Sequence, residues 1–326
     1  MKRRLKKGRI QGTVKGTRRR KAVIGIGVMI LTVIVILLIV LSALRISSLP
    51  GVGRELAEKA GVAYPAVIAH RGLSHNAPES TEHAYRLARE FEVDYLEADV
   101  QRTSDGYLVV YHDDRVTSEK TDVQNHFPDR EGDPLSSFTL EELQQLDIGS
   151  WFNEKYPDRS RSFYKGAGIL TLKDLIGLVI GFEKTGLYLE TKSPESQPGI
   201  EEDLINVLEE SGYNGSLVFQ SFSLDSLKRL RELRPEIPRV LLIREETAKE
   251  RGFNSIVDEA KYFVDGIGPV GHLAYPKHTG YAHREGLFVH HYTVNDAWMM
   301  QLFHFFGSDG FFTDRGDLAV ELLKNR

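Results

Sequence analysis

Short apolar runs alternate with segments of helical periodicity along most of the chain beyond residue 64. Runs of strand length separated by helical patterns are typical of βα units, in which the strands lie parallel. Candidate parallel strands occupy residues 66–70, 95–99, 187–192, 217–221, 239–243, 266–269, 287–293 and 310–313. Eight strand-helix units over this length predict an α/β fold of the (β/α)₈ TIM-barrel type.

One further apolar run, at residues 107–112, breaks this alternation. It is separated from the run at 95–99 by Ser104-Asp105-Gly106, which is typical of a hairpin turn. The connection is too short for a parallel crossover, so we expect the two strands to be antiparallel. Folding the chain about this turn places His112 opposite Glu97.

Residues 113–186 predict an insertion after this hairpin, because the segment is too long for a plain βα loop. Within it, Thr139 and Glu142 have the spacing of a capping box, which predicts a helix over residues 140–146. Aromatic residues follow this helix. One interpretation of the segment is a surface excursion with its own small aromatic core.

A long apolar stretch precedes the barrel. Residues 22–44 carry no charge and are long enough to span a hydrocarbon core of about 30 Å. The stretch exceeds the apolar region of a cleaved signal peptide, about 7–15 residues, and no small-x-small site follows it. It therefore predicts one retained transmembrane helix, followed by a stalk over residues 45–63 and the barrel domain over residues 64–326.

The charges around this stretch predict its orientation. Residues 1–21 contain eleven Lys and Arg and no acid, so the positive-inside rule places this basic arm in the cytoplasm. The large C-terminal part then lies outside the cell, attached to the cell membrane by a single pass. A nucleic-acid-binding arm is a weaker interpretation, because the apolar stretch follows at once.

The composition of the chain beyond residue 21 excludes several classes of partner and of catalytic chemistry. Without the arm, 31 of the 42 Lys and Arg remain against 46 Asp and Glu, which indicates an acidic soluble domain poorly suited to nucleic acid. The chain contains no cysteine, which excludes thiol catalysis and zinc-thiolate sites. We expect neither a nucleic-acid partner nor a protein partner.

Three carboxylates at strand ends predict a cation site. Glu97 and Asp99 alternate along one strand and so project from one face. Glu190 ends a similar apolar strand. A lone Glu-x-Asp usually lies on a solvated face, but here the flanking residues are apolar, and buried carboxylates without a cation or donor are costly. Oxygen ligands of this kind favour one divalent hard cation, Ca²⁺ or Mg²⁺.

Two histidines and two basic residues lie at the same strand ends. His70 and His112 are candidates for an acid-base pair, because imidazole exchanges protons near neutral pH. Arg71 and Lys192 are suited to hold phosphate oxygens, although they would equally balance the carboxylate charge. Because barrel enzymes carry their sites at the C-terminal strand ends, we expect these groups to converge.

Several short motifs recur in the order and spacing of a known family. They are His70-Arg71-Gly72, Pro78-Glu79-Ser80-Thr81, Glu97-Ala98-Asp99, His112-Asp113, Glu190-Thr191-Lys192, residues 146–152, residues 292–295 and Thr313-Asp314. In these motifs the chain resembles the glycerophosphodiester phosphodiesterase family, as a membrane-anchored bacterial member, over roughly residues 64–320. Ser80 stands where the family usually has Asn, and Tyr292 where it commonly has Trp.

The resemblance implies a metal-dependent hydrolysis of glycerophosphodiesters to glycerol 3-phosphate and an alcohol at the outer face of the membrane. The substrate's own 2-hydroxyl would attack phosphorus, giving a cyclic phosphate that water then opens. His70 and His112 would share the proton transfers, and the residues do not distinguish acid from base. The resemblance also implies an insertion that covers the barrel mouth. Glu79, Phe222 and Tyr292 are further candidate substrate contacts.

Two alternatives stay open at this point. The same site would serve a lysophospholipase D-type enzyme or a hydrolase of a glycerol-phosphate wall polymer, since the anchor brings both substrates close. A catalytically inactive surface binding module belongs to another class. It is disfavoured because the candidate catalytic and ligating residues are all present.

Overall fold

The computed structural model describes residues 26–27, 29–43, 51–182 and 184–324, in two compact units, Met1–Ile46 and Ser47–Arg326. In the first unit, residues 29–43 are helical. Among the described residues, no helix combines the length and the apolar character needed to cross a membrane. The basic arm over residues 1–21 and part of the predicted helix over residues 22–44 lie outside the described residues, so the anchor stays a prediction.

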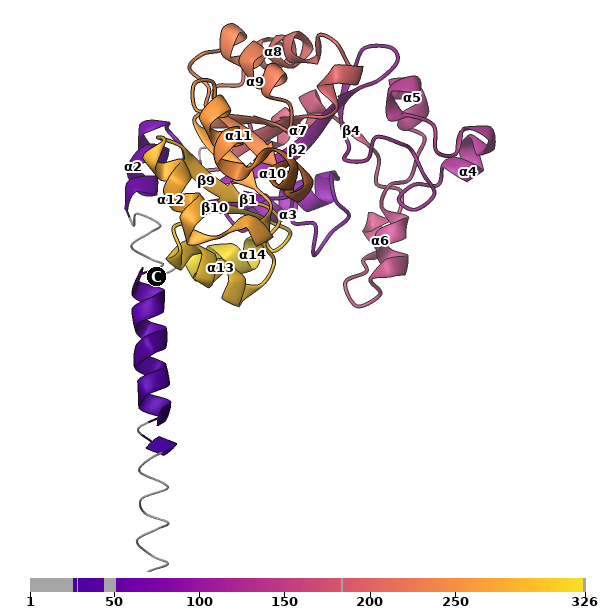
Figure 1. Ribbon diagram of the computed structural model, residues 1–326. Helices are drawn as coiled ribbons and strands as arrows, with labels where there is room; N and C mark the ends of the chain where they lie inside the picture. Colours follow the sequence, from indigo (N-terminus) through magenta and orange to yellow (C-terminus); the bar gives the residue numbers. More distant parts are fainter. Residues whose placement is uncertain (1–25, 28, 44–50, 183, 325–326) are drawn as a thin grey trace, which may run out of the picture. The chain divides into compact units, whose positions relative to one another are not determined.

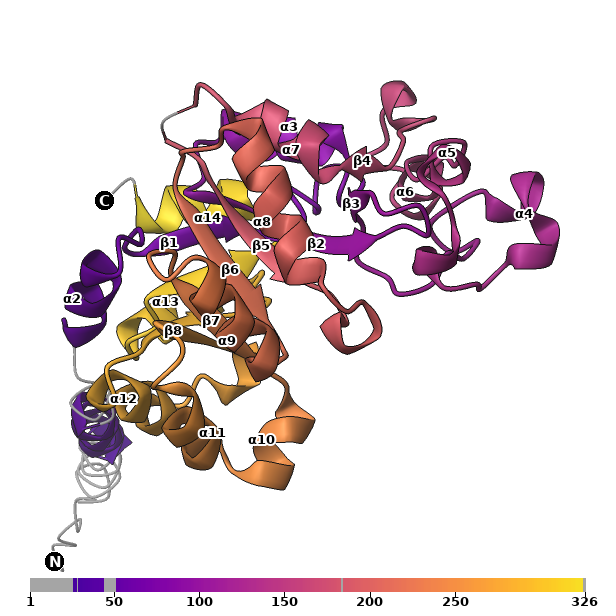
Figure 2. The ribbon, with the colours of Figure 1, turned by 90° about the horizontal axis from the view of Figure 1, so that it is seen from above.

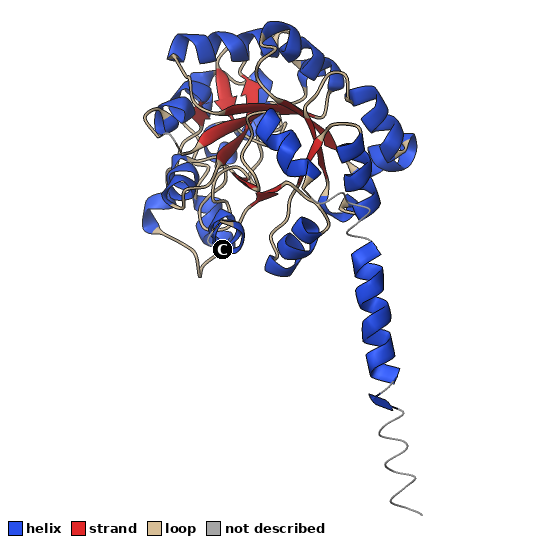
Figure 3. Ribbon diagram, turned by 90° about the vertical axis from the view of Figure 1, so that its left-hand side faces the viewer, coloured by secondary structure: helices blue, strands red, loops and turns tan. Residues whose placement is uncertain are grey.

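The second unit confirms the predicted barrel. In its described residues the parallel strands are β1 (Ala66–Ala69), β2 (Tyr95–Arg102), β5 (Gly186–Thr191), β6 (Leu217–Ser221), β7 (Arg239–Ile243), β8 (Gly266–Pro269), β9 (Phe288–His291) and β10 (Gly310–Thr313). They run in the order β1-β10-β9-β8-β7-β6-β5-β2, and β1 also pairs with β2, which closes the ring. Figure 3 shows the strands enclosed by helices.

Helices separate the strands and cover the outside of the barrel (Figure 1). They are α3 (Glu82–Glu90), α7 (Leu172–Val179), α8 (Ile200–Ser211), α9 (Leu224–Leu233), α10 (Glu245–Arg251), α11 (Phe253–Ala260), α12 (Pro276–Arg284), α13 (Ala297–Phe305) and α14 (Gly316–Leu323), with 3₁₀ turns η4 (Pro194–Ser196) and η5 (Gly271–Leu273). Side-chain caps fix some starts: the Thr81 hydroxyl accepts from the Ala84 amide at the start of α3.

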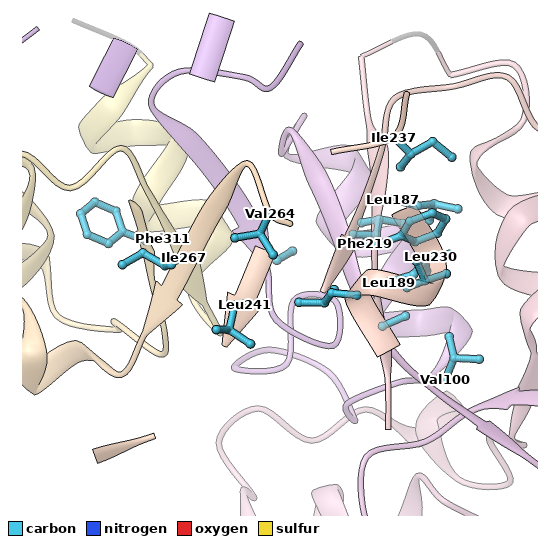
Figure 4. Packing of buried hydrophobic residues seen from close by; sticks show 14 of the residues in the cluster. Val100, Leu187, Leu189, Phe219, Leu230, Ile237, Leu241, Val264, Ile267 and Phe311 are labelled. Atoms are coloured by element: carbon cyan, nitrogen blue, oxygen red, sulfur yellow. The ribbon is translucent and has the colours of Figure 1, made fainter. Parts of the chain in front are cut away.

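Strand alternation divides the core into two layers. Leu187 and Leu189 of β5 point outward and pack with Phe219 and Leu230 between strands and helices (Figure 4). Tyr188, between them in the sequence, belongs to the separate cluster that fills the barrel interior. Because side chains alternate along a strand, Glu190 shares the interior side with Tyr188, and Glu97 and Asp99 share the interior side of β2 with Tyr95.

The segment predicted as a stalk contains a helix that belongs to the barrel. Helix α2 (Val52–Lys59) buries Ala57 in the interior cluster. Gly53 lies so close to Asp309 that a Cβ there would be 1.8 Å from the carboxylate. A stalk would be surrounded by solvent. The close backbone approach at Gly53 and the burial of Ala57 show instead that residues 51–63 pack against the barrel.

The hairpin is antiparallel as predicted, but its register differs by one residue. β2 pairs with β3 (Leu108–Val110) through Val100↔Val110 and Arg102↔Leu108, so the prediction of His112 opposite Glu97 is wrong. The turn is a three-residue loop closed by Thr103, with Gly106 in the left-handed region at φ 90°. In a ladder closed by Thr103 and Tyr107, the position opposite Glu97 is that of Asp113, one residue beyond His112.

The insertion begins after β3 and has its own apolar core. It contains α4 (Val123–His126), α5 (Leu140–Leu143), α6 (Ser150–Lys155), β4 (Leu170–Thr171) and 3₁₀ turns η1 (Pro128–Arg130), η2 (Leu135–Ser137) and η3 (Ser162–Tyr164). Figure 2 shows these helices gathered beyond β3 and β4. The Thr139–Glu142 capping box is present, although α5 is shorter than expected. Helix α7, inside the predicted range 113–186, packs between α3 and α8 as a barrel helix.

Candidate active site

The predicted site residues converge at the C-terminal ends of the barrel strands. One pocket is lined by His70, Arg71, Glu97, Asp99, His112, Glu190, Lys192, Gln220, Phe222, Leu242, Tyr292, Thr293 and Phe312. Of the predicted residues, only Glu79 does not line the described pocket. It lies beside the pocket, with its Oε1 2.9 Å from Nη1 of Arg71.

Three buried carboxylates form the floor of the pocket. Asp99 and Glu190 are directly paired across β2 and β5, and Glu97 is two residues away on the same face. One oxygen of each lies within 4.8 Å of the others. Burial and the negative charge of Asp99 raise the pKa of Glu97 well above its usual range and that of Glu190 to about 7. Burial alone would raise the pKa of Asp99 too, but Arg71 and Lys192 outweigh it and lower that pKa.

This carboxylate cluster fits a hard cation. Within the described part of the chain, Asp99 Oδ2 is buried without a hydrogen-bond partner. The Glu97 oxygens accept from the Arg71 amide at 2.8 Å and from Gln220 Nε2 at 3.0 Å, which orients the carboxylate. Three converging carboxylates repel one another in a buried site, and their oxygens are the ligands that Ca²⁺ and Mg²⁺ prefer.

Arg71 is held in an uncommon backbone conformation at the rim of this cluster. Its φ of 56° lies in the left-handed region, which is costly for a residue with a side chain. In this conformation its amide reaches Glu97, and its guanidinium reaches Glu79 at 2.9 Å and Asp99 at 3.4 Å. Burial alone would lower its pKa, but these carboxylates raise it, so Arg71 presents a fixed positive charge.

Lys192 supplies a second positive charge from the end of β5. Its ammonium lies 3.5 Å from Glu190 Oε1 and 3.6 Å from Asp99 Oδ1. Burial alone would lower the pKa of Lys192, yet the two carboxylates outweigh it and raise that pKa. Two permanent cations beside the carboxylates make this end of the pocket suitable for a phosphate group.

Each histidine is oriented by a carboxylate on Nδ1. His70 Nδ1 is 2.7 Å from Asp314 Oδ1, and His112 Nδ1 is 2.6 Å from Asp113 Oδ1. An ionised carboxylate only accepts, so Nδ1 carries the proton and Nε2 is the atom left for a ligand. Interaction with His70 holds the pKa of Asp314 at about 2 despite its burial, and the pKa of Asp113 is also lowered.

His112 is shifted toward its neutral form. Burial lowers its pKa, and the hydrogen bond to Asp113 offsets this only in part. A neutral imidazole with a free Nε2 is able to accept a proton near neutral pH. The two histidines therefore present the same hydrogen-bonding arrangement from two different loops.

Phe222 and Tyr292 form an apolar wall. Their ring centroids lie 5.9 Å apart at an interplanar angle of 86°. The guanidinium of Arg244 lies 3.5 Å from the centre of the Phe222 ring, a cation–π contact that helps to hold that ring. Apolar surface opposite the charged floor is suited to the carbon atoms of a small polyol ester.

Four residues that shape the site are not among those predicted from the sequence. Asp113 and Asp314 stand in recognised motifs, and Asp113 also adjoins the candidate His112; the sequence contains no other signal for them. Gln220 is the last residue but one of β6, where it pairs with Glu190 of β5 and donates to Glu97. Lys120 comes from an irregular part of the insertion and contacts both Glu79 and Asp113, which no sequence pattern indicates.

Comparison with known proteins decides the family. Residues 70–318 match the model of the Glycerophosphoryl diester phosphodiesterase family. The chain belongs to this family. A glycerophosphodiester phosphodiesterase of Bacillus subtilis (strain 168) is 34% identical over 267 residues, covering 79% of this chain and 86% of the relative. A Haemophilus influenzae protein of the same name is 29% identical over 327 residues, covering 79% and 89%.

Solved structures of this glycerophosphodiester phosphodiesterase family share the fold. An Oleispira antarctica phosphodiesterase in complex with the product sn-glycerol-3-phosphate is 26% identical, with a TM-score of 0.65, covering 81% of this chain and 98% of that one. These matches confirm the family and the enzyme class, a phosphoric diester hydrolase.

Proposed function

We propose that this enzyme hydrolyses glycerophosphodiesters to glycerol 3-phosphate and an alcohol, with one divalent cation. The observation that carries the proposal is the convergence in one pocket of two His-Asp pairs, two fixed cations and three buried carboxylates. The name of the Bacillus subtilis relative and the product bound to the Oleispira antarctica protein agree with this substrate class.

Glu97, Asp99 and Glu190 would hold the cation, either Ca²⁺ or Mg²⁺. When bound, such an ion polarises phosphate oxygens and a hydroxyl ligand. The charge balance supports one divalent ion. The three carboxylates exceed Arg71 and Lys192 by one negative charge, so a divalent ion leaves one net positive charge for a singly charged phosphodiester.

Arg71 and Lys192 would bind the phosphate oxygens. Arg71 offers a planar fork of donors and Lys192 a compact ammonium, and neither loses its charge at neutral pH. Both are fixed by the carboxylates before substrate arrives, so they stabilise charge that develops on the phosphate without rearrangement. Phe222 and Tyr292 would contact the glycerol carbons.

The histidines would carry the protons. One Nε2 accepts the proton of the glycerol 2-hydroxyl as that oxygen attacks phosphorus, and the other donates a proton to the departing alcohol. A cyclic glycerol phosphate results. Water then opens the ring while His70 and His112 exchange roles. Because both Nδ1 atoms are bound to carboxylates, either Nε2 is able to hold or release a proton.

The function is tested by release of glycerol 3-phosphate from a substrate panel. The panel contains glycerophosphocholine, glycerophosphoethanolamine, glycerophosphoglycerol, a lysophospholipid and a poly(glycerol phosphate) wall polymer, each with Ca²⁺ or Mg²⁺. We expect turnover of the small glycerophosphodiesters and a transient cyclic phosphate visible by ³¹P NMR. Turnover of the lysophospholipid or the polymer alone would replace the proposed substrate, and no release from any of them would overturn the function.

We also propose that the enzyme acts at the outer face of the cell membrane. The uncharged stretch at residues 22–44 and the eleven basic residues before it support a single-pass anchor with a cytoplasmic N-terminus. Protease added to intact cells should then remove the barrel domain and spare the basic arm. Recovery of the mature protein in the medium with a new N-terminus near Ser47 would contradict the anchor.

A further inference from the structure

One lysine of the insertion reaches the rim of the active site. Lys120 lies between β3 and α4, and its side chain is 21% exposed. Its Nζ atom is 2.9 Å from Glu79 Oε1 and 2.9 Å from Asp113 Oδ2. A single ammonium therefore bridges two carboxylates that lie in different segments of the chain.

Each of these carboxylates contacts a different part of the proposed machinery. Glu79 accepts from Nη1 of Arg71 at 2.9 Å, and Asp113 lies 2.6 Å from Nδ1 of His112. The contacts form a continuous chain from the phosphate-binding guanidinium to the imidazole. Lys120 is the central member of that chain, and it lies further into the insertion than Asp113, which stands at its start.

The cluster needs a positive charge at this position. Oxygen or nitrogen atoms of Glu79, His112 and Asp113 lie within 4.8 Å of one another. Two carboxylates so close repel each other unless a cation lies between them. Burial alone would lower the pKa of Lys120, but Glu79 and Asp113 raise it, so the ammonium stays charged and provides that cation.

We infer that Lys120 is a positioning residue that holds Asp113 against His112 and Glu79 against Arg71, and so makes the insertion a working part of the active site. The inference rests on the proposed function for its kinetic consequences. Its structural content, the coupling of Lys120 to His112, is measurable without turnover.

The first test replaces the charge in the full-length protein. We expect Lys120→Met to lower kcat by about tenfold or more, in the range seen when partners of active-site groups are removed, with a smaller change in KM. Lys120→Arg keeps the charge and should recover most of the loss. Lys120→Gln, which keeps hydrogen bonding without charge, should resemble Lys120→Met and serves if the methionine variant does not fold.

A matched control separates positioning from the stability of the insertion. Arg130 pairs with Glu142 and Asp133 in the same insertion, away from the pocket residues. We expect Arg130→Gln to leave kcat within about twofold of the unmodified protein. An equal loss in Arg130→Gln and Lys120→Met would assign the effect to the insertion as a whole and overturn the inference.

A double-variant cycle tests the route through Asp113. If Lys120 acts by holding Asp113, then kcat of Lys120→Met/Asp113→Asn should lie close to that of Asp113→Asn alone. Independent roles would multiply the two losses, because the effects of uncoupled sites add in free energy. Full multiplication would therefore contradict the proposed route.

The last test follows His112 directly by NMR of histidine-labelled full-length protein, with the signal assigned from its loss in His112→Asn. The groups that act on His112 are Asp113, Asp99, Arg71 and Lys192, with Glu79 beside it. Without Lys120, Asp113 is no longer held against Nδ1, so its hydrogen bond to the imidazolium weakens and the pKa of His112 should fall by about half a unit or more, whereas a rise would contradict the positioning role.

The two readouts distinguish failure of the inference from failure of the function. If the unmodified protein releases no glycerol 3-phosphate, the proposed function fails, and the NMR titration still decides the role of Lys120. If Lys120→Met leaves both kcat and the His112 titration unchanged, the inference is wrong whatever the substrate.

Discussion

The two histidines of the site present the same arrangement, but the chain builds it in two different ways. His70 follows β1 and meets Asp314 after β10, across 244 residues of sequence. His112 meets its immediate neighbour Asp113 in the loop after β3. The first pair exists only if β1 and β10 close the barrel. The second is local, and its carboxylate is held by the insertion.

The surroundings of the two carboxylates differ accordingly. Asp314 also accepts from Asn295 at 2.7 Å and from Ser74 at 3.0 Å, so neutral groups of the barrel loops fix it. Asp113 is fixed by the charged Lys120. The same hydrogen-bonding pattern therefore depends on closure of the barrel for His70 and on an electrostatic contact with Lys120 of the insertion for His112.

The largest expected effect comes from removing either imidazole. If both share the proton transfers, His70→Ala and His112→Ala should each lower kcat by about 10²–10⁴-fold. KM should change much less, because Arg71 and Lys192 still hold the phosphate. Steady-state kinetics on glycerophosphocholine measure both. A folded His112→Ala variant with near-normal turnover would remove the local pair from the mechanism.

Weakening the cation site should lower activity whichever of the two His-Asp pairs is considered, because both pairs serve the same phosphate. We expect Glu97→Gln to lose about 10²-fold in activity and to bind Ca²⁺ or Mg²⁺ more weakly, because one of three carboxylate ligands is lost. Calorimetric metal titration and activity after chelation check this. Full activity of the variant after exhaustive chelation would contradict a cation site.

Replacing Asp314 or Asp113 should distinguish the two His-Asp pairs by their effect on the thermal stability of the protein. Asp314→Asn and Asp113→Asn should each lower kcat by roughly tenfold or more, because the imidazole loses its orienting acceptor. Asp314→Asn should also lower Tm by about 2–6 °C, since its carboxylate joins loops after β1, β9 and β10. Thermal unfolding of both variants measures the difference. A larger Tm loss in Asp113→Asn than in Asp314→Asn would contradict the claim that Asp314 is the carboxylate that links the barrel loops.

The smallest expected effect is a shift in pH dependence. Burial lowers the pKa of His112, so activity that needs its neutral form should persist below about pH 6.5, the ordinary imidazole value. Asp113→Asn removes a negative charge from the imidazolium and should move this acid limb further down. Lys120→Met should move it down as well, by less, because Asp113 is then no longer held against Nδ1. Profiles of kcat/KM against pH check the signs, and a move of the Lys120→Met limb to higher pH would contradict the positioning role of Lys120.

Local pattern was enough to predict the barrel and most of the candidate site. Strand length and alternation predicted the positions of the eight parallel strands, and the alternation of Glu97 and Asp99 predicted their shared interior face. The recurring motifs predicted the family, which the comparison confirms. These features succeed because side-chain periodicity and motif spacing are properties of short segments.

Errors arose where a feature depends on contacts outside its own segment. The sequence predicts a stalk over residues 45–63, and only the contacts of residues 51–63 with the barrel interior show that α2 belongs to the barrel. The hairpin register shifted because the turn adopts a three-residue loop, which the strand pattern does not specify. Helix α7 was assigned to the insertion because its packing partners are distant in sequence.

Local sequence pattern establishes the kind of fold, the identity of the charged groups and the adjacency of His112 and Asp113. Three contacts become visible only in the folded chain: Asp314 orients His70, Gln220 donates to Glu97, and Lys120 bridges Glu79 and Asp113. The difference arises from the sequence separation of the residues involved. Periodicity is set by the geometry of consecutive residues, whereas these contacts form only when barrel closure and the insertion bring distant segments together.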